Sequence, residues 1–88
     1  MVEKDADYRG FHIIINADPS PDHKWRARST LHEGIGHVTP LLAVEGLTAE
    51  DALKVALDQA QREVDKILRW REILDDQEAE LKSREHLG

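Results

Sequence analysis

The stretch LTAEDALKVALDQAQREVDKIL, residues 47–68, decides the fold of this chain. Thr48 is a good N-cap, and Glu50 and Asp51 place negative charge in the first turn, where the helix dipole favours it. The apolar residues recur at steps of three and four, which lines them up along one face of a helix. They are Leu53, Ala56, Leu57, Ala60, Val64, Ile67 and Leu68. The stretch therefore predicts an amphipathic helix whose apolar face needs a surface to cover it.

Two segments upstream of this helix have the features of β-strands. Residues 8–17, YRGFHIIINA, are rich in residues that favour strands. Residues 23–32, HKWRARSTLH, alternate strictly, which is the period of a half-buried strand. The stretch DPSPD, residues 18–22, separates the two and predicts a turn, because its prolines fix φ. The side of the second strand that faces the core is predicted to carry Trp25, Ala27, Ser29 and Leu31.

Residues 37–46, HVTPLLAVEG, form the third predicted strand, after a glycine-containing turn at EGIG. Pro40 cannot donate a hydrogen bond to a neighbouring strand. This strand must therefore lie at an edge of the sheet, or start at or after the proline. Simple alternation places Leu42 and Val44 on one side of the strand, and Leu41 and Ala43 on the other.

The order strand, strand, strand, helix predicts an α+β domain over residues 8–68. Its simplest form is a three-stranded antiparallel meander packed against one long C-terminal helix. Residues 1–7 carry charge without a pattern, and we expect them to be disordered. We interpret residues 69–88 as a helical extension of the domain or a charged tail. Whether the helix continues past Asp75 stays open.

The composition restricts the classes of function. The chain has 88 residues, a net charge of −6 and no cysteine. An acidic balance is unusual for proteins that neutralise nucleic-acid phosphates, and without cysteine there are no disulfides, thiolate metal sites or thiol nucleophiles. No apolar run approaches the roughly 20 residues of a membrane helix, and the acidic N-terminus does not resemble a signal peptide. We therefore expect a soluble, cytoplasmic protein that does not contact membranes.

The helix is predicted to outrun the sheet that it covers. Strands of about eight residues span roughly 26 Å, which about 18 helical residues match, so the sheet should end near Ile67. The following residues favour a helix and include Trp70, Ile73, Leu74 and Leu81. Apolar residues on an overhang suggest a partner protein, a second copy or a curl back onto the sheet. The alternative is a frayed, highly charged tail.

The stretch HEGIGH, residues 32–37, invites comparison with zinc enzymes. The motif H-E-x-x-H needs two histidines four residues apart on a helix, whereas His32 and His37 are five apart around the glycines of a predicted turn. A hairpin could still place these histidines across from each other, with His12 as a third ligand. We interpret them as surface histidines beside a turn, and we expect no metal and no cofactor.

The outward side of the second predicted strand is basic. Lys24, Arg26 and Arg28 project from it, and a basic sheet face is one way in which proteins hold single-stranded RNA or DNA. Such proteins also stack bases on exposed aromatic residues, and Trp25 falls on the opposite side of this strand. A solvated strand face is the simpler interpretation, and nucleic-acid contact is the alternative.

No pattern predicts a catalytic centre. Carboxylate pairs such as Asp75 with Asp76 lie on a charged helix surface, without the burial that shifts pKa values for acid–base work. Ser20 and Ser29 lack the context of a nucleophile elbow, and no glycine-rich phosphate loop is present. We therefore expect a protein that is not an enzyme.

The start of the helix resembles that of a known family. Gly46 and Thr48 are followed by acidic residues and then by Ala52 and Leu53. With the strands before it, this pattern resembles the N-terminal domain of HicB-like antitoxins over about residues 8–67. The resemblance implies a partner-binding module that neutralises a small toxin. The chain departs from the family at the second turn, and an acidic helical segment replaces the DNA-binding module that often follows, so binding to an operator is not implied.

These observations together predict a non-catalytic protein-interaction module, HicB-like and homodimeric. Its contact surface is predicted to be formed by Trp70, Ile73, Leu74 and Leu81. The alternative function is nucleic-acid contact through Lys24, Arg26 and Arg28.

Overall fold

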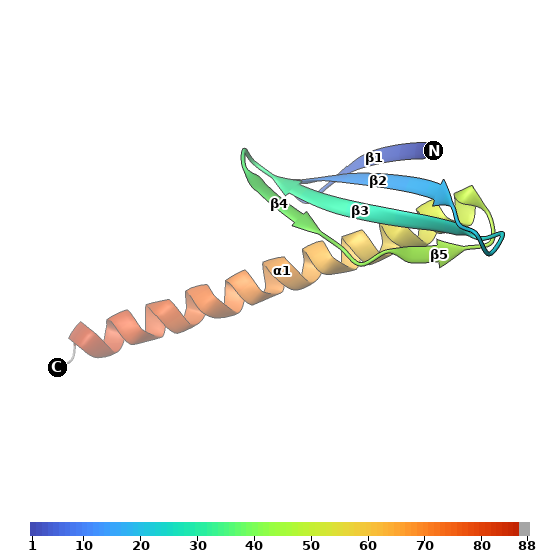
Figure 1. Cartoon of the computed structure of the whole chain (residues 1–88). Coiled ribbons are helices and arrows are strands. Elements are labelled where there is room, and N and C mark those ends of the chain that lie inside the picture. Colours follow the sequence, from blue (N-terminus) through green and yellow to red (C-terminus); the bar gives the residue numbers. More distant parts are fainter. Residues whose placement is uncertain (87–88) are drawn as a thin grey trace.

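The computed structural model describes residues 1–86, with side chains described as far as Gln77. It confirms the α+β class, because an antiparallel sheet packs against one C-terminal helix (Figure 1). The strands are β1 (Val2–Tyr8), β2 (Phe11–Pro19), β3 (Trp25–Glu33), β4 (His37–Pro40) and β5 (Val44–Gly46), and the helix is α1 (Ala49–His86).

The first three strands form an antiparallel meander, and β3 pairs along its other edge with both β4 and β5. The turn between β1 and β2 consists of Arg9 and Gly10, whose φ angles are 49° and 88°. Positive φ at both positions is typical of the type I′ turn, which matches the twist of a hairpin. The loop between β2 and β3 comprises residues 20–24, two residues later than predicted, because β2 continues to Pro19.

The N-terminal segment differs from the expectation of disorder. Residues 2–8 form β1, which pairs with β2 along its whole length. The sheet therefore has one more row than the three-stranded meander that the sequence suggested. The segment VEKDADY does alternate, but its outward row is acidic and its inward row contains Lys4, so the period of a half-buried strand is concealed.

The third predicted strand is divided into β4 and β5 by a β-bulge. Between the last residue pair of β4 and the first of β5, residues 41–43 face only two residues of β3. The extra residue turns Leu41 and Val44 toward the core and leaves Leu42 83% exposed. The prediction that Leu42 and Val44 share a side is therefore wrong, because strict alternation fails at a bulge. The edge position inferred from Pro40 is confirmed.

The core lies between one face of the sheet and the first half of α1. The alternation predicted for β3 is confirmed, and β2 alternates in the same way. Small side chains on the helix let it lie close to the strands. The strands contribute Phe11, Ile13, Ile15, Ala17, Ala27 and Leu31 to the core, and the helix contributes Ala52, Leu53, Ala56, Ala60 and Val64.

The chain passes from β5 to α1 through a close backbone contact. A Cβ atom at Gly46 would lie 2.5 Å from the backbone nitrogen of Ala52, so only glycine fits there without a shift of the backbone. Thr48 caps the helix as predicted, because its Oγ1 accepts a hydrogen bond from the backbone N–H of Asp51 at 3.1 Å. Gly46 and Thr48 thus fix where the helix begins.

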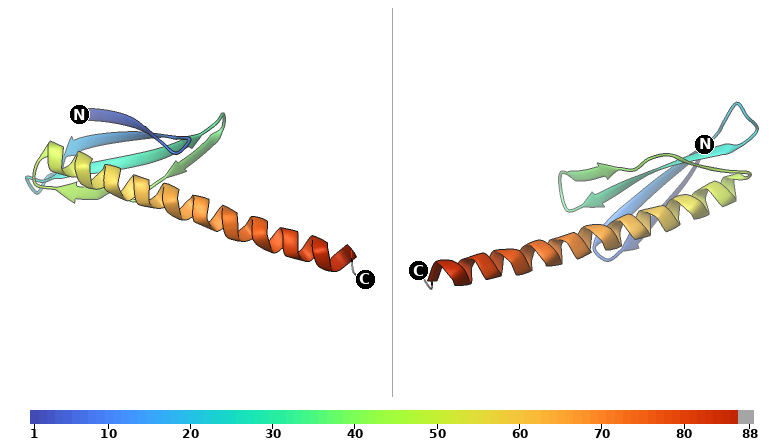
Figure 2. Two further views of the ribbon diagram at one scale, coloured as in Figure 1. Left: turned by 180° about the vertical axis from the view of Figure 1, so that it is seen from behind. Right: turned by 90° about the horizontal axis from the view of Figure 1, so that it is seen from below.

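α1 outruns the sheet and continues through Asp75 and Asp76 (Figures 1 and 2). Its 38 residues correspond to about 57 Å at 1.5 Å per residue. The molecule measures 64 × 23 × 17 Å, and its radius of gyration is 17.7 Å, whereas a compact chain of this length has about 12 Å. We call residues 69–86 the projecting segment of α1.

Candidate interaction surfaces

The projecting segment carries three exposed apolar side chains at its base. Trp70 is 57% exposed, Ile73 41% and Leu74 57%. Trp70 and Leu74 follow Ile67 by three and seven residues, so they continue the stripe of α1 that packs on the sheet. The sheet ends before it can cover them. Leu81, the fourth predicted contact residue, lies outside the residues whose side chains are described.

Arg71 fixes the base of the projecting segment to the end of β3. Its Nη1 donates a hydrogen bond to Oε2 of Glu33 at 2.6 Å, and its Nη2 donates a second one to Oε1. The hydrogen bonds from Arg71 lower the pKa of the Glu33 carboxyl. The guanidinium also lies over the ring of Phe11, 5.7 Å from its centroid. The direction of the segment is therefore set by specific contacts at its root.

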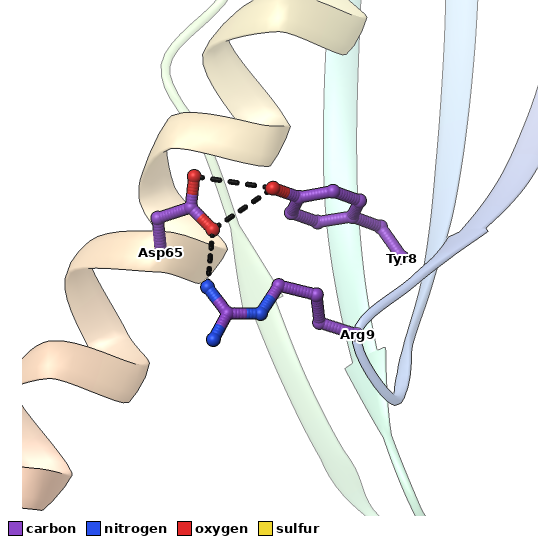
Figure 3. Close-up of polar contacts among 3 residues, drawn as sticks. All are labelled: Tyr8, Arg9 and Asp65. Carbon is purple, nitrogen blue, oxygen red and sulfur yellow. Dashed lines mark hydrogen bonds and ion pairs between the residues drawn. The ribbon is translucent and has the colours of Figure 1, made fainter.

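A second polar cluster ties the β1–β2 hairpin to α1 (Figure 3). The hydroxyl of Tyr8 donates to both carboxylate oxygens of Asp65, at 2.9 and 3.2 Å, and Nη1 of Arg9 donates to Oδ1 at 2.7 Å. The hydrogen bond from Arg9, and then the one from Tyr8, lower the pKa of Asp65. This cluster holds the first hairpin on the helix, and the sequence reasoning missed it because its members are more than fifty residues apart.

The face of the sheet that points away from α1 is polar, and we call it the open face. Arg26 and Arg28 lie on it, exposed as predicted. Nη2 of Arg26 is 3.6 Å from Oε1 of Glu45, while Arg28 forms no ion pair with any described residue. Both arginines line a hollow of about 250 Å³, together with Asp18, Pro19, Ser20 and Pro21. Lys24 lies in the preceding loop and does not line the hollow.

His12 lies on the open face between two acids of β1. Its Nδ1 is 2.7 Å from Oδ1 of Asp7, and its Nε2 is 3.3 Å from Oδ2 of Asp5. The hydrogen bond with Asp7 is the main cause that raises the pKa of His12, and the charges of both acids add to it. Protonated His12 therefore links β1 to β2 through side chains.

The histidines of the HEGIGH stretch do not face each other. His32 lies opposite Val38, while His37 lies opposite Glu33. His32 lies beside His12 in the register of β2 and β3, but its Nε2 contacts the hydroxyl of Thr30 at 3.0 Å. Residues 1–77, whose side chains are described, contain no group of three or more histidine or acidic side chains that could hold a metal ion.

The serine of β3 and the pair of aspartates on α1 were considered above as possible reactive groups, and the first is buried while the second are exposed to solvent. Ser29 is buried against the helix, and its hydroxyl has no hydrogen-bond partner among the described residues. Asp75 and Asp76 are exposed on the projecting segment.

Comparison of the chain with protein-family models, with curated proteins and with solved structures finds no match. Within the described part of the chain, no helix combines the length and the apolar character that crossing a membrane requires.

Proposed function

We propose that this chain is a non-catalytic protein-interaction module whose contact surface is the projecting segment of α1. One observation carries the proposal: Trp70, Ile73 and Leu74 are exposed on a helix that extends past the sheet. Aromatic and aliphatic side chains of this kind, grouped on a rigid element, are typical anchors of protein interfaces. The partner is a second copy of the chain or another protein.

The fixed root of the segment supports this proposal. Because Arg71 holds the helix on Glu33 and Phe11, the apolar side chains are presented in a defined direction, and little conformational freedom is lost on binding. The resemblance of the helix start to HicB-like antitoxins suggests the same class of function, a module that acts by holding a partner.

Light scattering on the full chain tests the proposal. The variant Trp70→Gln with Leu74→Gln removes the apolar anchors without changing the net charge, and it should reduce self-association. Lys66→Gln with Asp76→Gln is the matched control, because both residues are exposed, the net charge is again unchanged, and the apolar stripe remains. If both variants associate like the wild-type chain, the projecting segment is not the contact surface for a second copy.

The hollow beside Arg26 and Arg28 favours a second candidate function, contact with single-stranded RNA or DNA. Two guanidinium groups on one strand face can each hold a phosphate. Fluorescence anisotropy with a labelled oligonucleotide at low salt should then show binding that weakens as salt rises. Changing Lys24, Arg26 and Arg28 to glutamine should abolish it. A chain that leaves the anisotropy unchanged at low salt would rule this function out.

A further inference from the structure

The open face of the sheet carries negative charges along β1 and positive charges along β3. No described residue of the chain covers this face, and α1 lies on the other one (Figures 1 and 2). The outward row of β1 is acidic, and that of β3 begins with two arginines. Strand pairing places these rows level with each other: Glu3 with Asn16 and Arg28, Asp5 with Ile14 and Thr30, and Asp7 with His12 and His32.

The two rows lie at equal distances from β2, because neighbouring strands are about 4.8 Å apart. Consider a two-fold axis that runs along β2 in the plane of a face-to-face contact. Rotation about this axis places the β1 row of one copy over the β3 row of the other, and it leaves each residue at the same position along the strands. Glu3 of one copy then faces Arg28 of the other, and Asp7 faces His32. Thr30 faces Asp5, so no acid of β1 faces another acid.

The other face-to-face arrangement lacks this match. A two-fold axis across the strands would place β1 over β1, so that the acids of one copy would face the acids of the other. Like charges brought together in this way oppose association. The charges of the β1 and β3 rows therefore favour the axis along β2. On this axis each outward residue of β2 meets its own counterpart: the partly buried Ile14 gives an apolar centre, while His12 and Asp18 bring like groups together toward the two ends of the strand and lower the affinity.

We propose that the open face is the seat of a second copy of this chain, packed sheet to sheet about an axis along β2. The acids along β1, with Asp18 and Glu45 on the same face, make a nucleic-acid strand a poorer occupant, because they repel phosphate. Only the rows of β1, β2 and β3 overlap about this axis, and at a length of about 26 Å they give roughly 370 Å² per copy, below the usual 800 Å² or so. We therefore expect a dissociation constant on the order of micromolar or weaker, sensitive to salt.

This proposal does not depend on the projecting segment, so each can fail alone. Sedimentation of the full chain across a concentration series should show self-association that weakens with salt. Arg28→Glu and Glu3→Arg should each weaken it by about tenfold or more. The double variant Glu3→Arg with Arg28→Glu should restore it, because the exchanged charges match again across the axis. Lys66→Glu, on the exposed side of α1, makes the same charge change as Arg28→Glu and should have no effect.

A single-cysteine experiment tests the position of the axis. The chain has no cysteine of its own, so Ile14→Cys introduces one thiol at the predicted centre, where a short bismaleimide should link two copies. Val55→Cys, exposed on α1, is the control and should not be linked. Two results overturn the proposal: a chain that stays monomeric at low salt, or self-association that survives Arg28→Glu and is lost in the Trp70→Gln, Leu74→Gln variant. The second result would support the projecting segment instead.

Discussion

Gly46 and the small residues of α1 determine how closely the helix lies on the sheet. At Gly46 the backbone of β5 passes against the backbone of Ala52, with no room for a side chain. Ala52, Ala56 and Ala60 are fully buried, so along this line the helix meets the strands through methyl groups alone. A helix with larger residues at these positions would have to move away from the strands.

Gly46→Ala should therefore destabilise the fold. The added Cβ would meet backbone atoms, which cannot move aside as the end of a flexible side chain can. We expect a loss of about 2–3 kcal/mol in the free energy of unfolding, measured by urea denaturation. Gly34→Ala is the control: its φ is 60°, but a Cβ there meets nothing within 4 Å, so it should cost only about 1–2 kcal/mol. Equal losses at the two sites would contradict the steric explanation.

Asp65 should make stability depend on pH in the acid range. Its pKa is lowered in the folded chain by hydrogen bonds from Arg9 and Tyr8. A carboxyl whose pKa is lower when folded stabilises the fold above its unfolded pKa of about 3.9, and this stabilisation is lost as the pH falls through the folded pKa. Asp65→Asn should therefore lower the urea midpoint at pH 7 and have a smaller effect at pH 2.5.

The control for this measurement is Asp76→Asn, at an exposed position on the projecting segment. It should leave the midpoint close to that of the wild-type chain at both pH values. An Asp65→Asn effect of the same size at pH 7 and pH 2.5 would show that the loss comes from packing rather than from the charged carboxylate.

At the scale of elements, the sequence predicts those parts whose pattern is set by one buried face. β3 alternates because every second residue lies under the helix, and α1 shows its period for the same reason. The sequence did not predict β1, because this edge strand lies beside the helix rather than under it. Lys4 can therefore point to the inner side of the sheet and still be exposed. The bulge at residues 41–43 was not predicted either, because Pro40 indicates an edge but not an extra residue.

For a related reason, the sequence predicts the exposed residues of the candidate surfaces but not the polar contact that holds the projecting segment. The exposure of Trp70, Ile73 and Leu74 follows from comparing the lengths of helix and strands, and the exposure of Arg26 and Arg28 follows from alternation. The bond between Arg71 and Glu33 joins residues 38 apart in the chain. No local pattern encodes such a pair, because it depends on where the helix crosses the end of β3.

His12 should control how firmly β1 is held in the sheet. Its pKa is raised mainly by the hydrogen bond with Asp7, with Asp5 adding to the effect. A histidine whose pKa is higher when folded stabilises the fold below its unfolded pKa of about 6.5, and this stabilisation is lost as the pH rises through the folded pKa. His12→Gln should therefore speed amide hydrogen exchange in β1 at pH 6 and change little at pH 9, compared with the wild-type chain at each pH.

His37→Gln is the control for this experiment, because His37 lies on β4, away from β1. It should leave exchange in β1 unchanged. Faster exchange in β1 at pH 9 as well as at pH 6 would mean that His12 acts through packing. The acids Asp5 and Asp7 and the neighbouring His32 are the titratable groups that face His12 on the open face.

At the scale of the whole molecule, the two proposed surfaces lie on opposite sides of the sheet's plane. The open face points away from α1, and the projecting segment leaves the sheet along the helix (Figure 2). A chain that uses both surfaces with copies of itself has two independent two-fold contacts, which build species larger than a dimer. We therefore expect the wild-type mass from light scattering to exceed that of two chains at high concentration.

Each single-surface variant should then stop at a dimer. Arg28→Glu leaves the projecting segment, and Trp70→Gln with Leu74→Gln leaves the open face. Combining all three changes should give a monomer with a radius of gyration near 17.7 Å. A wild-type chain that never exceeds two copies would show that at most one of the surfaces binds a second copy.

The length of α1 also has a consequence for how its far end comes to be helical. Forming the first turn of a helix in water is the unfavourable step, and isolated helices shorter than about 12–15 residues are marginal even with the best sequences. The half of α1 that packs on the sheet is already helical and serves as the nucleus. The remaining residues extend the helix from it, and each residue added gains one hydrogen bond. The packed half of α1 thus stabilises helical backbone as far as about 27 Å beyond the sheet. Any change that detaches the helix from the strands should therefore also destabilise the helix at its far end.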